Sequence, residues 1–224
     1  MLIAQQNVVR RRKLVEICQE MHQRGLVRGK AGNASARASS GVLITPSGIP
    51  YDEMKPSDIP QIDDDGQLVE CELLGTCPHA PSSEWHLHTD LLRARPDMNA
   101  VLHTHPPFCT TLAVLEKSIP AIHYMIGIVD ANEIPCAPYH TFGTDELSRA
   151  VVETMGDCRA CLLAHHGLVV LAPDLEAAMT LTVEVESLAE LYWRALAVGE
   201  PAVLDDAEMH RVREKFGRMN YGPQ

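Results

Sequence analysis

Hydrophobic positions follow helical spacing in some segments of the chain and strand spacing in others, which predicts a mixed α/β fold. Leu14, Ile17, Cys18 and Met21 recur at the spacing of an amphipathic helix, and Gly25 stands where that helix would end. Short apolar runs predict buried strands at residues 42–45, 100–105, 160–164 and 168–172. Further helices are expected at residues 82–95, 108–115, 144–154, 174–198 and from 205 onward. Because these elements intermix without a repeat or a linker, we expect one domain over residues 1–224.

The charge balance limits the classes of partner. The chain of 224 residues carries 19 Lys and Arg against 30 Asp and Glu, a net charge of −11. An extended nucleic-acid or anionic-membrane surface would need a basic face, so we expect neither kind of partner. No apolar run approaches the roughly 20 residues of a membrane-spanning helix.

Cysteine usage favours a reducing compartment. The seven cysteines are odd in number and scattered along the chain, which argues against a disulfide framework. The first residues are polar and are followed by a basic run, so we expect no signal peptide and a cytoplasmic location. Cys158 and Cys161 have redox-pair spacing, but they lie in an apolar run and are expected to be buried thiols.

The histidine count is the unusual feature of the composition. There are 11 histidines against three Phe and two Trp, and this surplus calls for a chemical explanation. His103 and His105 lie two residues apart in a predicted strand, so they project from one face. This spacing suits chelation of a divalent metal, zinc above other common ions, and two polar residues on a solvated face are the alternative. Of the later pair, His166 is expected to supply a third ligand and His165 to orient it.

A third histidine-containing string, residues 81–88, joins two serines to a glutamate. Ser82 and Ser83 are expected to begin a helix, where backbone N–H groups and the dipole attract a phosphate; plain capping is the alternative. Glu84 is expected in the first turn, where its carboxylate would reach the metal or act on the substrate as an acid or base. His88 lies one turn below and is expected to pack or to support the site from behind.

Two further loops have the composition of phosphate-binding turns. Gly32 and Asn33 form one, and Ser47 and Gly48 form the other. Neither is a P-loop, and each alone is a weak signal. Together with the double serine they would make a largely uncharged phosphate cup, which suits a chain with a net charge of −11.

Seven strings occur along the chain in the order typical of one protein family. They are GNASAR (32–37), ITPSGIPY (44–51), PSSEW (81–85), AVLHTH (100–105), IPAIHYMI (119–126), IPCAPYHTFGTDEL (134–147) and HHGL (165–168). On these motifs, which span nearly the whole chain, the sequence resembles the class II aldolase/adducin family. The resemblance implies a three-layer α/β fold with a central, mainly antiparallel sheet flanked by helices. It also implies a homotetramer with active sites between subunits.

The resemblance further implies roles for individual residues. One zinc ion per subunit would be held by His103, His105 and His166. Glu84 would be the fourth ligand when no substrate is bound. Once displaced by substrate, Glu84 would act as the catalytic base. Tyr124 of a neighbouring subunit would donate a proton to the aldehyde oxygen. The residues implied to close the pocket from that neighbour are Phe142 and Tyr221. Those implied to hold the phosphate are Gly32, Asn33, Ser47, Gly48, Ser82 and Ser83.

The activity implied by the resemblance is reversible cleavage of a ketose 1-phosphate to dihydroxyacetone phosphate and a short aldehyde. The substrate would be L-fuculose 1-phosphate or a related deoxy-sugar phosphate. Alternatives in the superfamily are a methylthioribulose-1-phosphate dehydratase, a ribulose-phosphate 4-epimerase and a sugar-acid phosphate decarboxylase, or an adducin-like scaffold without catalysis. The loop at residues 66–81 is longer than the family pattern and carries Cys71, Cys77 and His79, where we expect an exposed insert rather than a second metal site.

Overall fold

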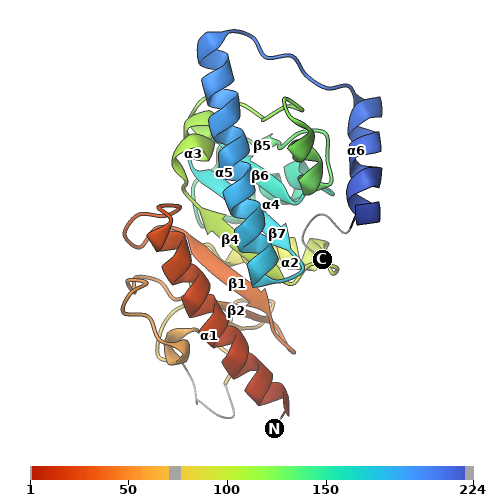
Figure 1. Cartoon of the computed structure of the whole chain (residues 1–224). Coiled ribbons are helices and arrows are strands. Elements are labelled where there is room, and N and C mark those ends of the chain that lie inside the picture. Colours follow the sequence, from red (N-terminus) through yellow and green to blue (C-terminus); the bar gives the residue numbers. More distant parts are fainter. Residues whose placement is uncertain (1, 71–76, 220–224) are drawn as a thin grey trace.

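A seven-stranded sheet forms the centre of the molecule (Figure 1). The computed structural model describes residues 2–70 and 77–219. The strands lie in the order β3-β2-β1-β4-β7-β6-β5, and each neighbouring pair is antiparallel except β5 and β6. Their bounds are β1 (Asn33–Arg37), β2 (Val42–Ile44), β3 (Gln61–Ile62), β4 (Ala100–Thr104), β5 (Cys136–Ala137), β6 (Ala160–Leu163) and β7 (Gly167–Ala172). The expected α/β fold with a mainly antiparallel sheet is confirmed.

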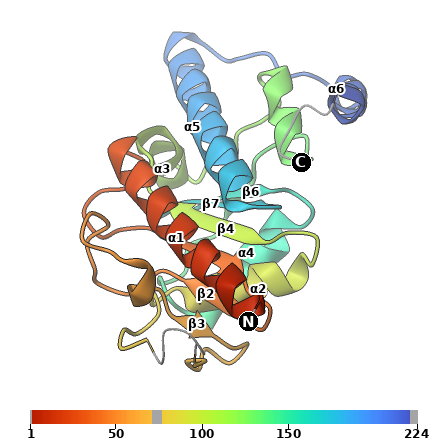
Figure 2. The ribbon, with the colours of Figure 1, turned by 60° about the horizontal axis from the view of Figure 1, so that its bottom comes forward.

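Helices cover both faces of this sheet and complete three layers. The helical elements are α1 (Leu2–Gln23), η1 (Pro56–Asp58), α2 (Trp85–Ala94), α3 (Pro107–Val114), η2 (Tyr124–Val129), α4 (Asp145–Met155), α5 (Leu175–Val198) and α6 (Asp206–Met219). α1 and α5 lie over one face, and α2 and α4 lie over the other (Figure 2). α6 stands to one side and packs on the 3-10 helix η2 (Figure 1). Within the described residues, none of the helices has the length and apolar character needed to cross a membrane.

Strand β1 shows how the sheet separates a packing face from a polar one. Ala34 and Ala36 belong to the core between the sheet and α1. Asn33 and Ser35 point to the opposite face, where both contact His88 of α2. Because side chains alternate along a strand, one short segment serves the core on one side and a polar cluster on the other.

Side-chain caps explain where two predicted helices begin. At α4, the Thr144 hydroxyl accepts a hydrogen bond from the Leu147 N–H (3.3 Å). At α5, the Asp174 carboxylate accepts one from the Ala177 N–H (2.7 Å). Such caps satisfy N–H groups that have no partner within the helix, so both starts could be predicted from the sequence.

The start predicted for α2 is wrong by three residues. The helix begins at Trp85 with Glu84 as its N-cap, so Glu84 precedes the first turn and both serines lie in the loop before it. The reason is a contact between loops: the Ser82 N–H donates to the Thr45 carbonyl oxygen (2.9 Å), which holds the chain in a non-helical path there. Phosphate binding by the serines would therefore depend on the loop rather than on the first turn.

Gly167 opens β7 at the point where it packs against the end of β4. A Cβ atom at this position would lie 2.4 Å from the Thr104 carbonyl oxygen and 2.6 Å from Cδ2 of His105. These distances are far below van der Waals contact. The close approach of β7 to His105 therefore requires a residue without a side chain.

Gly167→Ala should destabilise the fold and displace His105. Overpacking of a tight site typically costs about 1–3 kcal/mol, which corresponds to a fall in unfolding temperature of roughly 2–12 °C for a chain of this size. Thermal denaturation followed by circular dichroism measures the change. Gly199→Ala is the matched control, because a Cβ there would meet no atom within 4 Å. Equal unfolding temperatures for the two variants would contradict the packing argument.

Candidate metal and catalytic site

Three histidines from two parts of the chain converge at the end of β4. His103 is buried in β4, His105 follows directly after the strand, and His166 lies in the turn between β6 and β7. The Nε2 atom of His103 is 2.9 Å from Nε2 of His105 and 3.2 Å from Nε2 of His166. All three candidate ligand atoms lie within 4.8 Å of one another. The structure thus brings together the three residues that the sequence selected.

The buried imidazole of His103 presents a lone pair to the centre of this cluster. The Nδ1 atom of His103 lies 3.0 Å from the Leu168 carbonyl oxygen. A carbonyl can only accept, so Nδ1 carries the proton and Nε2 is left unprotonated. Burial lowers the pKa of His103 and His105, and lowers that of His166 to about 4. The rings are therefore neutral at neutral pH, the form in which histidine binds metals.

The carboxylate of Glu84 forms the fourth side of the cluster. Its Oε2 is 3.3 Å from Nε2 of His103, and its Oε1 is 3.5 Å from Nε2 of His166. Burial raises the pKa of Glu84, but His103, His166 and a hydrogen bond from the Asn33 amide lower it more strongly, to about 2. Among the described residues, Oε1 is buried without a hydrogen-bond partner. Glu84 is therefore an ionised group with one oxygen free to bind a ligand.

This donor set fits a divalent metal ion. The unprotonated Nε2 of His103 and the acceptor-only carboxylate of Glu84 lie 3.3 Å apart, and two acceptors at this distance repel. A cation at the centre would relieve this repulsion. In a tetrahedral zinc site with metal–nitrogen bonds of about 2.0–2.1 Å, neighbouring nitrogens are roughly 3.3 Å apart, close to the separations given above.

Three loops meet beside the cluster. The Thr45 N–H donates to the Ala34 carbonyl (3.0 Å), the Ser82 N–H donates to the Thr45 carbonyl (2.9 Å), and the Ser47 N–H donates to the Ala80 carbonyl (3.0 Å). These contacts join the loop segments that carry the residues predicted to bind phosphate, namely Gly32, Asn33, Ser47, Gly48, Ser82 and Ser83. Phosphate binding by this set stays a prediction.

Gly32 lies where one of these loops meets the cluster. Its φ angle is +80°, in the left-handed region that favours glycine, and a Cβ would lie 2.8 Å from the His103 carbonyl oxygen. The glycine therefore lets the loop approach the strand that carries His103.

Asn33, His88 and Ser35 form a buried polar group behind Glu84. The Asn33 amide donates to Oε2 of Glu84 (2.8 Å), the His88 ring contacts the Asn33 amide oxygen, and Ser35 Oγ lies 2.7 Å from Nδ1 of His88. Support from His88 was expected, but Ser35 was missed. The available signal was alternation in β1, which puts Asn33 and Ser35 on one face.

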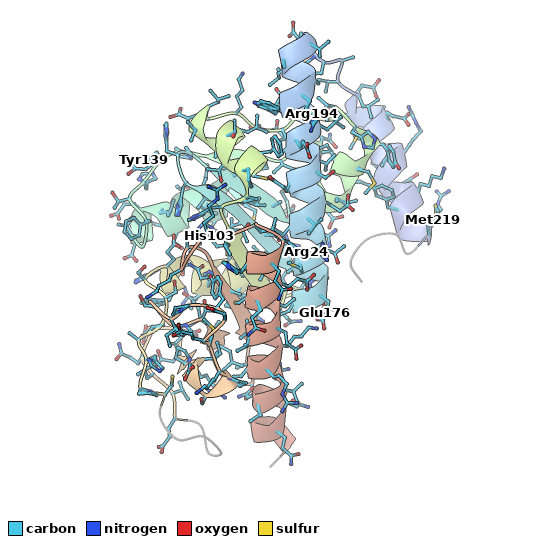
Figure 3. All side chains as sticks on the ribbon, turned by 60° about the vertical axis from the view of Figure 1, so that its left-hand side comes forward. Arg24, His103, Tyr139, Glu176, Arg194 and Met219 are labelled. Atoms are coloured by element: carbon cyan, nitrogen blue, oxygen red, sulfur yellow. The ribbon has the colours of Figure 1, made fainter. Side chains whose placement is uncertain are left out.

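The predicted proton donor, Tyr124, lies against α6 rather than the histidine cluster within one chain. Tyr124 is 48% exposed in η2 and lines a pocket of about 580 Å³ with α6 residues, among them Phe216. Figure 3 shows His103 and Met219, the last residue of α6, on opposite sides of α5. Phe142 is 64% exposed in the loop before α4. Tyr221 lies outside the described residues, so the roles of all three stay predictions.

The orienting role expected for His165 is wrong. The residue has a φ of +55°, which turns its side chain away from that of His166. Its ring is 47% exposed, and Nε2 lies 3.1 Å from Oε1 of Glu116. The candidate ligand with a contact that orients its ring is His103, whose Nδ1 lies against the Leu168 carbonyl oxygen.

Within residues 2–70 and 77–219, the three histidines are the one group of at least three metal-ligating side chains close enough to bind an ion. Cys77 is buried, its thiol donates to the Asp58 carbonyl (3.3 Å), and Cys71 lies outside the described residues. Cys158 and Cys161 are free and buried, and burial raises the pKa of Cys158 to about 11. The expectation of buried thiols at this pair is confirmed.

Acid should destabilise the metal-free protein. Folding lowers the pKa of His88 to about 3 and that of His166 to about 4, from 6.5 in an unperturbed histidine. The unfolded chain therefore binds more protons below pH 6.5, so the stability from these groups is complete above that pH and is lost progressively toward pH 4. Each group contributes a slope of up to about 1.4 kcal/mol per pH unit.

Urea denaturation from about pH 8 to about pH 4.5 measures this slope. His88→Leu should reduce it, whereas Thr89→Val, a buried substitution at the next position of α2 that removes no titratable group, should leave it unchanged. An identical slope in wild type and His88→Leu would show that His88 does not titrate as described.

Comparison with known proteins is consistent with this geometry. Residues 12–193 match the family described as the class II aldolase and adducin N-terminal domain. The 5-methylthioribulose-1-phosphate/5-deoxyribulose-1-phosphate aldolase of Rhodospirillum rubrum is 48% identical over 206 residues, covering 92% of this chain and 90% of that protein. The L-fuculose phosphate aldolase of Escherichia coli K12 is 48% identical over 206 residues, covering 92% of this chain and 93% of that protein.

A solved structure agrees at the level of the whole fold. An L-fuculose 1-phosphate aldolase superposes with a TM-score of 0.87 at 37% identity, covering 93% of this chain and 96% of that one. These relatives support aldehyde-lyase activity, as the motifs indicated. The chain belongs to the class II aldolase and adducin family.

Proposed function

We propose that the protein is a zinc-dependent aldolase that reversibly cleaves a ketose 1-phosphate to dihydroxyacetone phosphate and a short aldehyde. The observation that carries the proposal is the convergence of His103, His105, His166 and an ionised Glu84 beside three joined loops. Relatives at 48% identity are named for L-fuculose phosphate and for 5-methylthio- and 5-deoxyribulose 1-phosphates. Related deoxy-sugar phosphates of this kind are the proposed substrates, and residues 1–224 are proposed to act as one domain.

Each residue has a defined part in this reaction. The three imidazoles would hold one divalent ion per subunit, a Lewis acid that stabilises negative charge developing on the substrate oxygens. In the direction of condensation, the Glu84 carboxylate removes a proton from the carbon beside the carbonyl of dihydroxyacetone phosphate. Tyr124 donates its phenolic proton to the aldehyde oxygen as the carbon–carbon bond forms. Cleavage follows the same steps in reverse, with each proton returned.

The phosphate would be bound without a cluster of basic side chains. The exposed Ser47, Gly48 and Ser83 lie where the loops join, and the hydroxyls of both serines and the N–H of Gly48 are the proposed donors, since the Ser47 N–H is bonded to the Ala80 carbonyl. Such groups can bind an anion through oriented dipoles. In a protein with a net charge of −11, this local arrangement would attract the substrate where the overall charge does not.

The site is proposed to be completed by a second copy of the chain. Tyr124 and Phe142 are both exposed, and within one chain Tyr124 lies against α6 rather than the histidines. A homotetramer in which η2 of one subunit reaches the cluster of the next would unite Tyr124 with Glu84. The six free cysteines of the described residues suit a cytoplasmic location.

Glu84→Gln should fold normally and lose most of its turnover. Glutamine keeps the shape of the side chain but cannot accept a proton from carbon, and loss of a general base typically costs about 10²–10⁴-fold. Steady-state kinetics with the zinc-loaded protein measure the change. Glu116→Gln is the matched control, since its carboxylate contacts the outward-facing His165. Turnover near the wild-type rate in Glu84→Gln would remove Glu84 from the mechanism.

A cleavage screen tests the proposed function itself. The zinc-loaded protein is incubated with L-fuculose 1-phosphate, 5-deoxyribulose 1-phosphate and 5-methylthioribulose 1-phosphate, and dihydroxyacetone phosphate is assayed by a coupled enzyme. Release from at least one sugar phosphate, lost after chelation and restored by zinc, is the expected result. No release from any of them, or conversion without dihydroxyacetone phosphate, would favour the dehydratase, epimerase or decarboxylase. Absence of bound metal and of any turnover would favour a scaffold.

A further inference from the structure

A buried chain of hydrogen bonds runs from the sheet to Glu84. It links Ser35 of β1 to His88 of α2, His88 to Asn33 of β1, and Asn33 to Glu84. Ser35 and His88 have no exposed surface, and Asn33 and Glu84 are also buried. We propose that His88 and Ser35 are positioning residues, which fix the Asn33 amide so that it holds the Glu84 carboxylate against the three histidines. The inference rests on the proposed role of Glu84 as catalytic base.

The chemistry of each partner sets the direction of the chain. An ionised carboxylate only accepts hydrogen bonds, so Asn33 must present its NH₂ group to Glu84. The Asn33 oxygen then faces His88 and must accept a hydrogen bond from the Nε2–H of that ring. Because a neutral ring carries one proton, Nδ1 of His88 is the acceptor, and the Ser35 hydroxyl donates to it. Burial holds His88 in this neutral form, with a pKa of about 3.

The amide of Asn33 has two orientations of similar shape. In the second, its oxygen would face the Glu84 carboxylate and its NH₂ group would face the Nε2–H of His88, so both contacts would repel. His88 therefore reinforces the orientation that Glu84 requires and fixes the amide from its other side, and Ser35 selects the tautomer of His88 that allows this. A satisfied buried network of this kind favours a single arrangement more strongly than any one of its bonds.

The carboxylate of Glu84 has one hydrogen-bond donor among the described side chains. Asn33 donates to Oε2, whereas Oε1, which lies 3.5 Å from Nε2 of His166, has no hydrogen-bond partner. The backbone behind Asn33 and Ser35 is rigid by comparison, because β1 pairs with β2 on one side and with β4 on the other. Asn33 lies directly opposite His103 in that pairing. The position of the Glu84 carboxylate relative to the three histidines thus depends on the amide of Asn33, whose backbone is fixed in the same sheet as His103.

The test compares two substitutions at His88. His88→Leu removes both ring nitrogens from the buried site, whereas His88→Gln restores an N–H donor near the place of Nε2. We expect kcat to fall about 10–100-fold in His88→Leu, the usual cost of losing an outer partner of a metal site, with KM changed less than about threefold. His88→Gln should recover most of kcat, and Ser35→Ala should lose about 2–10-fold. Bound zinc per subunit and unfolding temperature are measured for each variant.

Thr89→Val is the matched control. Thr89 follows His88 on α2 and is also buried, but its hydroxyl donates to the Trp85 carbonyl (3.0 Å) and the His86 carbonyl (3.1 Å) of its own helix. It should change stability without changing kcat. An equal loss of kcat in Thr89→Val and His88→Leu would mean that any disturbance of α2 is sufficient, and would overturn the proposal.

A double-mutant cycle shows whether His88 acts through Glu84. In a Glu84→Gln background, adding His88→Leu should lower the residual kcat less than about twofold, because the base it positions is already absent. A full additional loss would overturn the positioning role. Wild-type turnover in His88→Leu that binds a full complement of zinc would also overturn it. The same holds if kcat falls only in proportion to the zinc that the variant loses.

The outcomes separate this inference from the proposed function. Wild-type activity in Glu84→Gln would end both, since there would be no base to position. An inactive Glu84→Gln beside a fully active His88→Leu would end the inference alone. If His88→Leu fails to fold, Ser35→Ala and His88→Gln carry the test, and wild-type kcat in Ser35→Ala would overturn it.

Discussion

The pairing of β4 with β1 on one side and β7 on the other is the constraint on which the site depends. It sets Asn33 opposite His103 and His103 opposite Val169, in the middle of the sheet. Since side chains alternate along a strand, a slip of one residue in β4 would turn His103 to the face covered by α1. The core on that face, which includes Leu102, prevents the slip. Packing of apolar residues on one face therefore fixes the register of polar residues on the other.

Burial then gives those polar residues their chemical state. The rings of His103 and His166 are neutral because charging them away from water is unfavourable, while the carboxylate of Glu84 stays ionised beside them. The same burial makes every unpaired polar atom costly, which is why the Asn33 amide and the free Oε1 of Glu84 matter. The overall charge of −11 would repel the anionic substrate proposed above. Its binding would depend on hydrogen-bond donors placed locally by the loops beside the cluster.

How far the sequence could predict the site depended on whether the signal was local. His103 and His105 could be predicted because side chains two positions apart in a strand project from the same face. The fold could be predicted because the family motifs extend along nearly the whole chain. Alternation in β1 could place Ser35 on the face of Asn33, but its contact with His88 could not be predicted, because the two residues are 53 positions apart and meet only when α2 packs on β1. The role expected for His165 was wrong because a histidine side chain gives no indication that its own backbone will be left-handed. That conformation of His165 turns its ring outward, away from His166.

The two glycines that flank the end of β4 have a consequence for how such a protein can diverge. Gly32 lies against the His103 carbonyl and Gly167 against the Thr104 carbonyl, so neither position has room for even a methyl group. The strand end that carries His103 is thus enclosed by two glycines that cannot be replaced without moving the histidines. A change of substrate preference would have to arise at positions with room for other side chains, such as the exposed Phe142. Steric fit therefore restricts the residue type at the centre of the site and leaves its exposed rim open to change.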